Sequence, residues 1–445
     1  MNILHISPHL GGGVGTVLLS FLEYAAEVSK DVHKIICLDD INHNALERLT
    51  NAGVFWKENL TRDHQEILFQ ISKADIVIVH WWNHPLLYEF LIKAFLPPCR
   101  LIIWAHISGS PPPNCFTNQI FCYPDKFVFT TPLSFYDPIY QALPKNIKRK
   151  VGVIWSTGGV ERVMKYFNPK EKDNNLQVGY VGNLDFTKLH PSFVEICDSI
   201  DLENLTFVVI GPENKNLQAL VEKSSKKKNY LLTGYISEKE KYQRLNEFTC
   251  FGYPLAKHHY ATCDQTIQEA MALGVVPVVL SNAMESYMIE NGVTGLIAHN
   301  VEQYKLYVRE ICTNHKLRFK ISENARKFAI NEYSISKLHD KWHRIFFETM
   351  GIVKTSKSWN IESCTNKNEG HNIFLESLGN YAGPFKDYIS TKSFLEKDKI
   401  KSQIASLSAY PQWTSESKST VRHYLKFFPN DQYLQEWSLL IAQAS

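Results

Sequence analysis

The segment from Thr262 to Leu280 combines residue types that can bind a nucleotide. Four residues stand at the predicted start of a helix: Thr262, Cys263, Asp264 and Gln265. The free N–H groups and the partial positive charge of such a helix start attract phosphate oxygens. Glu269 follows about one turn later, where a carboxylate can accept two hydrogen bonds from vicinal ribose hydroxyls. Gly274 is then expected to end the helix, and Val275–Leu280 to form a buried strand. On position alone, Glu269 fits equally well as an acid that merely stabilises a helix N-terminus.

A second phosphate-binding candidate is the glycine-rich segment Gly11-Gly12-Gly13-Val14-Gly15-Thr16, which follows the first apolar run. Glycines let the backbone approach a phosphate closely, and a following helix offers free N–H groups. Thr16 is expected to cap that helix. The alternative is a plain strand-to-helix turn, but four glycines within five positions are more than a turn needs.

The same glycines partly match the dinucleotide-binding fingerprint of hydride-transfer enzymes. Its third glycine would have to stand at Thr16 or Leu18, and neither is glycine. Asp39 and Asp40 do follow the second apolar run, where a ribose-binding acid would lie. The match is partial, so a dehydrogenase stays a lesser alternative, testable by nicotinamide binding.

Two further side chains are placed where ligands collect in open α/β sheets. His106 ends the apolar run Leu101–Ala105, and Lys188 follows the run Val178–Val181. A histidine there can bond a sugar hydroxyl or a phosphate, and a lysine can neutralise a departing diphosphate. The ordinary alternatives are a histidine that caps its strand and a solvated lysine. His80 and His84 flank Trp81-Trp82, a pair more often found in a core than stacked on a sugar.

These candidates need a parallel sheet to position them, and the chain predicts two. Short apolar runs alternate with helical patterns such as Val17–Val28 and Leu86–Ala94, the βαβα rhythm of a parallel sheet covered on both faces. The first series of runs comprises Ile3–Ile6, Lys34–Leu38, Ile76–Val79, Leu101–Trp104 and Phe127–Phe129. The second comprises Val178–Val181, Phe207–Ile210, Leu231–Leu232, Phe251–Tyr253 and Val275–Leu280.

Length and composition support a globular protein of two α/β domains and an extra segment. The 445 residues exceed one ordinary core, and 44% hydrophobic with 21% charged residues excludes a disordered chain. We expect domains at 1–157 and 158–350, joined at the glycine pair Gly158-Gly159, then a polar linker at 351–372. Residues 373–445 have helical patterns at Tyr424–Phe428 and Tyr433–Ile441, but too few apolar residues for an independent core.

Net charge, cysteine content and hydropathy restrict the partners and the cellular compartment expected for this protein. A net charge of +3 gives no indication of nucleic-acid binding, and the basic run Lys226–Lys228 fits a solvated loop better than a membrane contact. Nine cysteines at irregular spacing, without a Cys-x-x-Cys pair, favour a reducing compartment. The pattern contains no signal peptide and no membrane-spanning run, and peripheral membrane contact stays open.

Six segments, in the same order along residues 1–350, resemble the signatures of the family 4 glycosyltransferases, a retaining group 1 type with the GT-B fold. They are Gly11–Gly15, His106, Gly158–Glu161, Gly182–Lys188, Glu269–Val279 and Asn291–Leu296. The resemblance implies two Rossmann-like domains facing a cleft: an N-terminal acceptor domain and a C-terminal nucleotide-sugar donor domain. The helical extension would be an addition to this fold.

The resemblance also implies roles for the candidate residues. His106 would contact the transferred sugar, and Lys188 would stabilise the leaving diphosphate, so both are predicted catalytic residues. The predicted donor-nucleotide site comprises Gly12, Gly13, Gly15, Asn183, Lys188, Thr262, Cys263, Asp264, Gln265 and Glu269. The implied reaction transfers a hexosyl-type sugar from a nucleotide sugar to a glycan or glycan-lipid acceptor, with retention, and the resemblance implies a cytoplasmic protein. With no Asp-x-Asp motif, we expect neither a metal nor another cofactor.

Two positions depart from the family pattern. The arginine of the phosphate-binding pair is Asn183 here, and the glutamate expected eight residues before Glu269 is Ala261. Asp264, His258 or His259 can substitute for that missing carboxylate, or the donor sugar differs, or transfer is lost. A non-catalytic nucleotide-sugar-binding protein and a GT-B nucleotide-sugar epimerase therefore stay open as alternatives.

Overall fold

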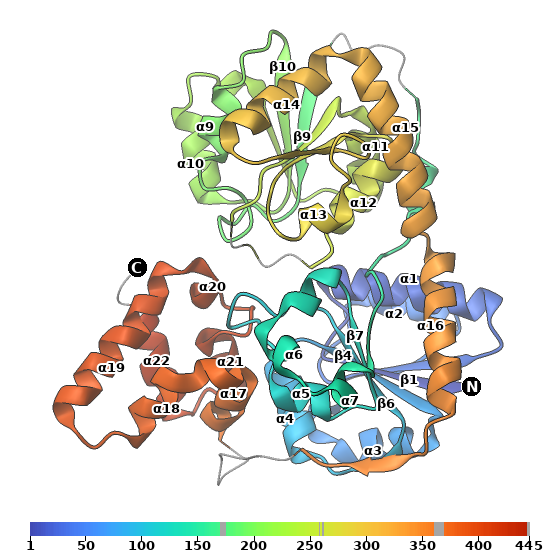
Figure 1. Cartoon of the computed structure of the whole chain (residues 1–445), viewed down its shortest axis with the longest axis vertical. Coiled ribbons are helices and arrows are strands. Elements are labelled where there is room, and N and C mark those ends of the chain that lie inside the picture. Colours follow the sequence, from blue (N-terminus) through green and yellow to red (C-terminus); the bar gives the residue numbers. More distant parts are fainter. Residues whose placement is uncertain (170–174, 258, 260–261, 360–368, 443–445) are drawn as a thin grey trace. The chain divides into compact units, whose positions relative to one another are not determined.

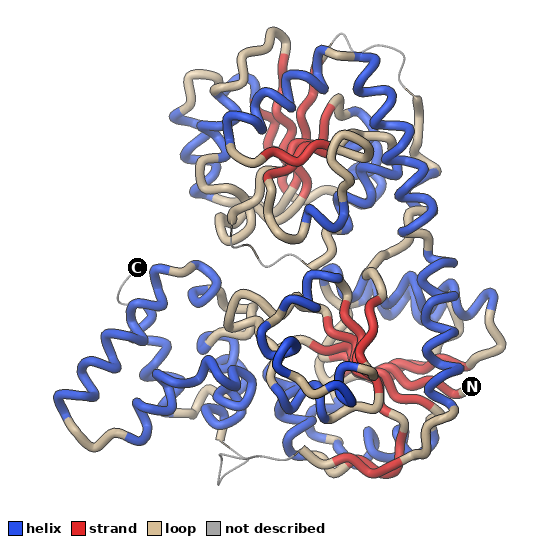
Figure 2. The backbone as a smooth tube through the Cα atoms, in the orientation of Figure 1, coloured by secondary structure: helices blue, strands red, loops and turns tan. Residues whose placement is uncertain are grey.

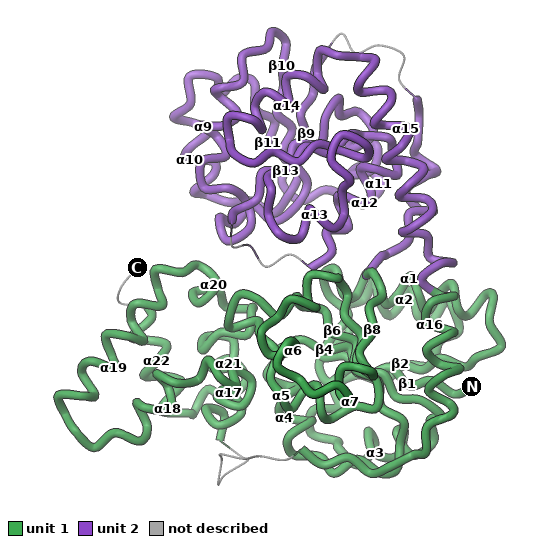
Figure 3. The backbone as a smooth tube through the Cα atoms, in the orientation of Figure 1, with its two compact units in different colours: residues 1–155, 339–445 green, residues 156–338 purple. Residues whose placement is uncertain are grey.

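The chain forms two compact units, which are described here separately (Figure 3). The computed structural model describes residues 1–169, 175–257, 259, 262–359 and 369–442. The first unit contains Met1–Trp155 and His339–Ser445, and the second contains Ser156–Leu338. The second unit thus ends at Leu338, whereas the sequence placed the end of the second domain at residue 350. The difference arises because Trp342 lies against Trp104 of the first unit, with ring centroids 4.8 Å apart.

The first unit is built on a seven-stranded parallel sheet in the order β3-β2-β1-β4-β6-β7-β8 (Figures 1 and 2). Its strands are β1 (Asn2–Ser7), β2 (Val32–Cys37), β3 (Phe55–Lys57), β4 (Ile76–Trp81), β6 (Leu101–Ala105), β7 (Lys126–Phe129) and β8 (Val151–Val153). Its helices are α1 (Gly12–Val28), α2 (His43–Asn51), α3 (His64–Lys73), α4 (Pro85–Lys93), α5 (Asn118–Cys122), α6 (Pro138–Ala142) and α7 (Lys145–Lys148), and α16 (Ile335–Met350) ends in this unit. The predicted strands are confirmed. The strand order reverses between β1 and β4, and the loops after these strands carry the glycine-rich segment and His84.

The second unit contains a six-stranded parallel sheet in the order β11-β10-β9-β12-β13-β14. Its strands are β9 (Leu176–Val181), β10 (Leu205–Ile210), β11 (Tyr230–Gly234), β12 (Cys250–Tyr253), β13 (Pro277–Leu280) and β14 (Leu296–Ala298). Its helices are α8 (Glu161–Met164), α9 (Phe193–Asp198), α10 (Lys215–Lys223), α11 (Glu238–Glu247), α12 (Gln265–Ala272), α13 (Glu285–Met288), α14 (Val301–Thr313) and α15 (His315–Glu332). All five predicted strands are present, and β14 is an additional short one. The two parallel sheets with their helices match the two Rossmann-like domains of the expected GT-B fold, and the helical C-terminal region is an addition to it.

The C-terminal extension is helical, as predicted, and packs on the first sheet's own layer of helices. It contains α17 (Gly370–Leu378), α18 (Gly383–Ser390), α19 (Phe394–Ser406), α20 (Pro411–Thr414), α21 (Val421–Phe427) and α22 (Gln432–Ala442). Buried side chains such as Phe374 and Trp437 belong to one continuous hydrophobic cluster with Leu4 and Val79 of the sheet. Asn83 Nδ2 joins the two parts by donating to the carbonyl oxygens of Cys115 (2.9 Å) and Ser377 (3.0 Å). The extension therefore shares the core of the first unit.

The start of the predicted linker at 351–372 is ordered, which corrects that prediction. Thr355–Lys357 forms β15, which pairs antiparallel with β5 (Leu96–Cys99). Trp359 is buried, with its ring 5.1 Å from that of Tyr123. The polar composition hid this segment, because pairing with β5 and one buried tryptophan fix it. Residues 360–368 lie outside the described part of the chain.

Candidate donor-nucleotide site

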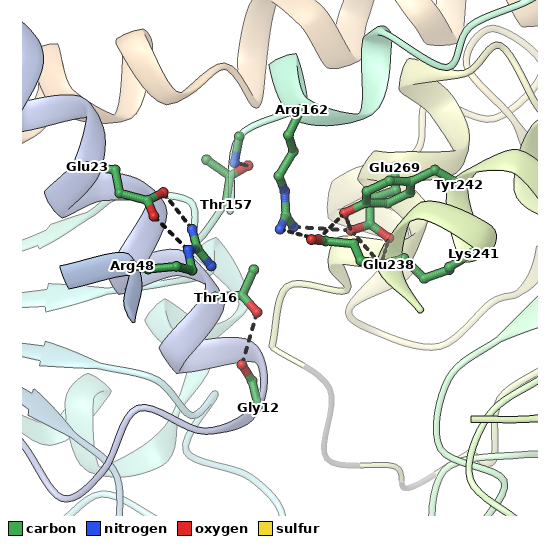
Figure 4. A network of polar contacts seen from close by, with 11 residues as sticks. Gly12, Thr16, Glu23, Arg48, Thr157, Arg162, Glu238, Lys241, Tyr242 and Glu269 are labelled. Carbon is green, nitrogen blue, oxygen red and sulfur yellow. Dashed lines mark hydrogen bonds and ion pairs between the residues drawn. The ribbon is translucent and has the colours of Figure 1, made fainter. Parts of the chain in front are cut away.

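Glu269 is a buried carboxylate on α12 of the second unit, and two cations neutralise it (Figure 4). Lys241 Nζ donates to both of its oxygens, at 3.0 Å and 2.9 Å, and Arg162 donates to Oε1 at 3.3 Å. The hydroxyl of Tyr242 lies 3.0 Å from Glu269 Oε1 and 2.6 Å from Glu238 Oε1, and donates to one of them at a time. Among the described residues, Lys241 donates to Oε2, and a carboxylate oxygen can accept a further hydrogen bond from a hydroxyl.

Sequence reasoning missed Arg162, Lys241 and Tyr242. Lys241 and Tyr242 lie on α11, and Arg162 lies on α8, far from Glu269 along the chain. Nothing in a lysine and a tyrosine on an amphipathic helix identifies them as partners of a distant glutamate. Arg162 lies three residues after Gly159, a position that only tertiary folding brings to Glu269.

The helix that carries Glu269 begins and ends as predicted. Asp264 is its N-cap residue, Gln265 its first helical residue, and Gly274 follows its C-cap with a φ of 70°. This φ lies in the left-handed region, which favours glycine. The Asp264 side chain does not cap the helix, so the first N–H groups of α12 keep no acceptor from that carboxylate.

Lys188 and Asp264, both predicted site residues, form an ion pair. Lys188 Nζ lies 2.7 Å from Asp264 Oδ1, and the side chains are 13% and 8% exposed. The ammonium also lies 5.6 Å from the centroid of the Tyr253 ring, at the end of β12. The structure thus brings the lysine after β9 to the N-terminus of α12. An anion bound at this helix start would share Lys188 with Asp264.

The other predicted residues of this unit differ in what they can offer. Cys263 is buried: its thiol donates to the carbonyl of Ser156 at 3.0 Å, and Gln268 Nε2 donates to Sγ at 2.9 Å. Burial raises the pKa of this thiol, so Cys263 can reach a ligand only through its main chain. Asn183 is exposed, and its Oδ1 accepts from the Asp185 N–H at 3.1 Å. Thr262 is half-buried, and Ala261 and His258 lie outside the described residues.

In the first unit, the glycine-rich segment is itself the first turn of α1. Gly11 is the N-cap, Gly12 has a φ of 62°, and Gly12 and Gly13 are exposed. A Cβ on Gly15 would lie 2.1 Å from the Leu10 carbonyl oxygen, so the chain needs glycine there for close packing. The prediction that Thr16 caps α1 is wrong, because Thr16 is inside the helix and its hydroxyl donates to the Gly12 carbonyl at 3.2 Å.

His106 ends a chain of four histidines that crosses the first sheet. His33, His5, His80 and His106 come from β2, β1, β4 and the end of β6, in the order of the sheet. Their ring nitrogens lie 2.9 Å, 3.0 Å and 3.1 Å apart along the chain. Burial lowers the pKa of His106 to about 3 and that of His33 to about 4, so the rings are neutral near pH 7.

This arrangement couples the tautomers of the four rings. Each link joins two nitrogens, so one must carry a proton and the other a lone pair. A neutral imidazole has one of each, so all four rings must donate in the same direction along the chain. His106 Nδ1, at the end of the chain, is therefore either a donor or an acceptor, and the whole chain decides which. The sequence predicted His106 as a site residue but gave no sign of this chain.

The buried histidines predict loss of stability in acid. Above a pH of about 6.5 both folded and unfolded states hold them neutral. Below this pH, the histidines are protonated in the unfolded state, whereas in the folded state they stay neutral until the pH is near 3 to 4. As the pH is lowered, the free energy of unfolding should therefore decrease by about 1.4 kcal/mol per pH unit for each proton that the unfolded state binds and the folded state does not. Two groups oppose this trend: burial raises the pKa of Asp137 to about 6, and Glu285 raises the pKa of His259 despite burial.

Urea unfolding at pH 7, 6 and 5 measures this loss. Replacing exposed His43 with alanine should leave the slope unchanged, and His80→Leu should reduce it. A free energy of unfolding that stays constant or rises down to pH 5 would contradict the prediction.

Comparison with known proteins agrees with this architecture. Residues 164–328 match the family described as "Glycosyl transferases group 1". The second unit is a group 1 glycosyltransferase domain. The match spans β9 to most of α15, and so includes Lys188, Asp264 and Glu269.

Similar proteins extend beyond the group 1 domain. An uncharacterized 41.2 kDa protein in the cps region of Klebsiella pneumoniae is 22% identical over 377 residues, covering 78% of this chain and 99% of that protein. The structure of Anabaena Alr3699/HepE in complex with UDP and glucose superposes with a TM-score of 0.60 at 12% identity, over 78% of this chain and all of that one. The lipopolysaccharide outer core galactosyltransferase WaaB gives 0.58 at 14%, over 78% and 99%. These likenesses establish the fold.

No helix among the described residues is long and apolar enough to cross a membrane.

Proposed function

We propose that this protein is a glycosyltransferase that moves a sugar from a nucleotide-sugar donor to a glycan or glycan-lipid acceptor, with retention of the anomeric configuration. The observation that carries the proposal is the group 1 domain with Glu269 on the helix whose N-terminus meets Lys188. A cytoplasmic protein of polysaccharide biosynthesis, with peripheral membrane contact, fits this reaction.

The donor nucleotide is assigned to the group 1 domain. Glu269 accepts hydrogen bonds from the ribose hydroxyls through Oε2. Phosphate oxygens bind the first N–H groups of α12, with main-chain groups contributed by Thr262, Cys263 and Gln265. Asn183 lies in the loop beside them. Lys188 stabilises the charge that develops on the leaving diphosphate, which requires it to leave or share Asp264.

The first unit supplies the remaining predicted groups. Gly12 and Gly13 are exposed residues in the first turn of α1 and are proposed to contribute main-chain N–H groups to anion binding, and Gly15 allows the close packing of this turn. His106 Nδ1 bonds a hydroxyl of the transferred sugar, with its tautomer held by His80. The acceptor hydroxyl then attacks the anomeric carbon from the face of the leaving group, the C–O bond to the diphosphate breaks, and the acceptor proton leaves with the diphosphate. His80 acts only by positioning His106.

The choice of substrates to test follows from the similar structures. The Anabaena protein was seen with UDP and glucose, so UDP-sugars come first. WaaB is described as a lipopolysaccharide outer core galactosyltransferase, so surface glycans and glycan-lipids are the first acceptors.

A thermal-shift screen against nucleotides and sugar nucleotides should identify the donor, because a ligand that binds only the folded state raises the melting temperature. The selected donor is then incubated with acceptor extracts, and transfer is followed by mass spectrometry and anomeric NMR. A chelator arm tests the expectation that transfer needs no divalent cation. Donor binding without transfer or hydrolysis would identify a non-catalytic binding protein, and a changed donor without acceptor would identify an epimerase. Either result would overturn the proposed transfer.

A further inference from the structure

Three buried ionisable side chains of the second unit face one another beside the Lys188–Asp264 ion pair. A ring nitrogen of His259 and one carboxylate oxygen each of Asp264 and Glu285 lie within 4.8 Å of one another. All three residues are buried. His259 follows β12, Asp264 is the N-cap of α12, and Glu285 begins α13. Two carboxylates and an imidazole thus converge from three separate elements.

The hydrogen bonding of His259 orients one nitrogen toward this cluster. Its Nδ1 lies 2.7 Å from the carbonyl oxygen of Ala256. A carbonyl can only accept, so Nδ1 carries the proton of this bond. The other nitrogen, Nε2, lies 3.2 Å from Glu285 Oε1. Histidines that bind metals typically donate their second N–H to a carbonyl or a carboxylate in this way.

The carboxylates facing Nε2 lack hydrogen-bond donors among the described residues. Among the described residues, Glu285 Oε1 pairs with His259 Nε2 without the geometry of a hydrogen bond, and Glu285 Oε2 and Asp264 Oδ2 have no hydrogen-bond partner. Glu285 is fully buried. Lys188 neutralises the other oxygen of Asp264 only. Glu285 raises the pKa of His259 despite burial, so an imidazolium can offset one negative charge here. A metal ion in place of that proton would also contact Glu285 Oε2 and Asp264 Oδ2, which lack donors among the described residues.

We propose that His259, Asp264 and Glu285 bind a divalent first-row metal ion. One imidazole nitrogen with two carboxylates suits ions such as Mn²⁺ or Zn²⁺. Metal–ligand bonds of about 2.1 Å join donors up to about 4.2 Å apart, so binding requires the side chains to close by a few tenths of an ångström. Three protein ligands leave coordination positions open. The ion would share Asp264 with Lys188, the lysine that the proposed function places at the donor, and transfer itself is still expected to need no divalent cation.

The test uses the full-length protein after chelator treatment and dialysis, without nucleotide. Titration with Mn²⁺, followed by EPR, should give one saturable site per chain. A pulsed EPR signal from nitrogen coupled to Mn²⁺ should be present and should disappear in His259→Gln. Glu285→Gln should weaken Mn²⁺ binding at least about tenfold. Exposed Glu290→Gln is the matched control and should bind Mn²⁺ like the parent.

Two results would overturn the metal site. One is the lack of saturable binding of either Mn²⁺ or Zn²⁺ to the folded parent protein, whose folding is checked by its melting curve. The other is a Mn²⁺ site without nitrogen coupling that survives both substitutions. In either case the three groups form an imidazole–carboxylate cluster only. Because no nucleotide or acceptor is present, the outcome is independent of whether the protein transfers sugar.

Discussion

Glu269→Gln is expected to weaken binding of the nucleoside diphosphate selected in the screen by about 100-fold. Two hydrogen bonds from ribose hydroxyls to a carboxylate contribute about 1.5 kcal/mol or more each, and about 1.4 kcal/mol corresponds to a factor of ten. The amide also leaves Arg162 and Lys241 facing a neutral group, which disturbs the positioning of the acceptor oxygens. Isothermal titration calorimetry measures the loss directly.

A deoxyribose analogue separates ribose recognition from a purely structural role of Glu269. The parent protein should prefer the ribonucleotide over its 2′,3′-dideoxy form, and Glu269→Gln should lose that preference. Tyr242→Phe is the matched control, because it removes a hydroxyl near Oε1 and keeps the carboxylate. If Glu269→Gln binds both forms equally weakly and Tyr242→Phe does the same, Glu269 only organises the local fold.

Lys188→Met is expected to lower kcat/KM for sugar transfer by about 10²- to 10³-fold, since the ammonium stabilises charge on the leaving diphosphate. The loss of affinity in Lys188→Met should depend on the charge of the ligand. It should be larger for the nucleoside diphosphate than for the nucleoside monophosphate. Lys188→Met leaves the buried carboxylate of Asp264 without its cation, so a melting curve checks that the variant is folded before its activity is compared.

Exposed Lys257→Met, in the same unit, controls for the loss of one positive charge. It should leave both kcat/KM and nucleotide affinity unchanged. Should Lys188→Met bind mono- and diphosphate as the parent does, Lys188 would serve only as the partner of Asp264, and the leaving-group role would fail.

The sequence determined the local elements and their order. Runs such as Ile76–Val79 form buried strands because parallel strands are covered on both faces and need apolar side chains throughout. Gly274 marked the end of α12 because the backbone there adopts a φ of 70°, which glycine accommodates without strain. The resemblance of Glu269–Val279 to a donor-site signature located the segment that the group 1 family match includes.

What the sequence left undecided depends on contacts between distant residues. The partners of Glu269 come from α8 and α11, and the ordered strand β15 is fixed by pairing with β5 rather than by its own polar residues. Four histidines spaced far apart form one chain only because β2, β1, β4 and β6 are neighbours in the sheet. The cluster of His259, Asp264 and Glu285 likewise exists only once three elements converge. Local patterns encode secondary structure, but burial, charge pairing and tautomer depend on neighbours that only the tertiary structure supplies.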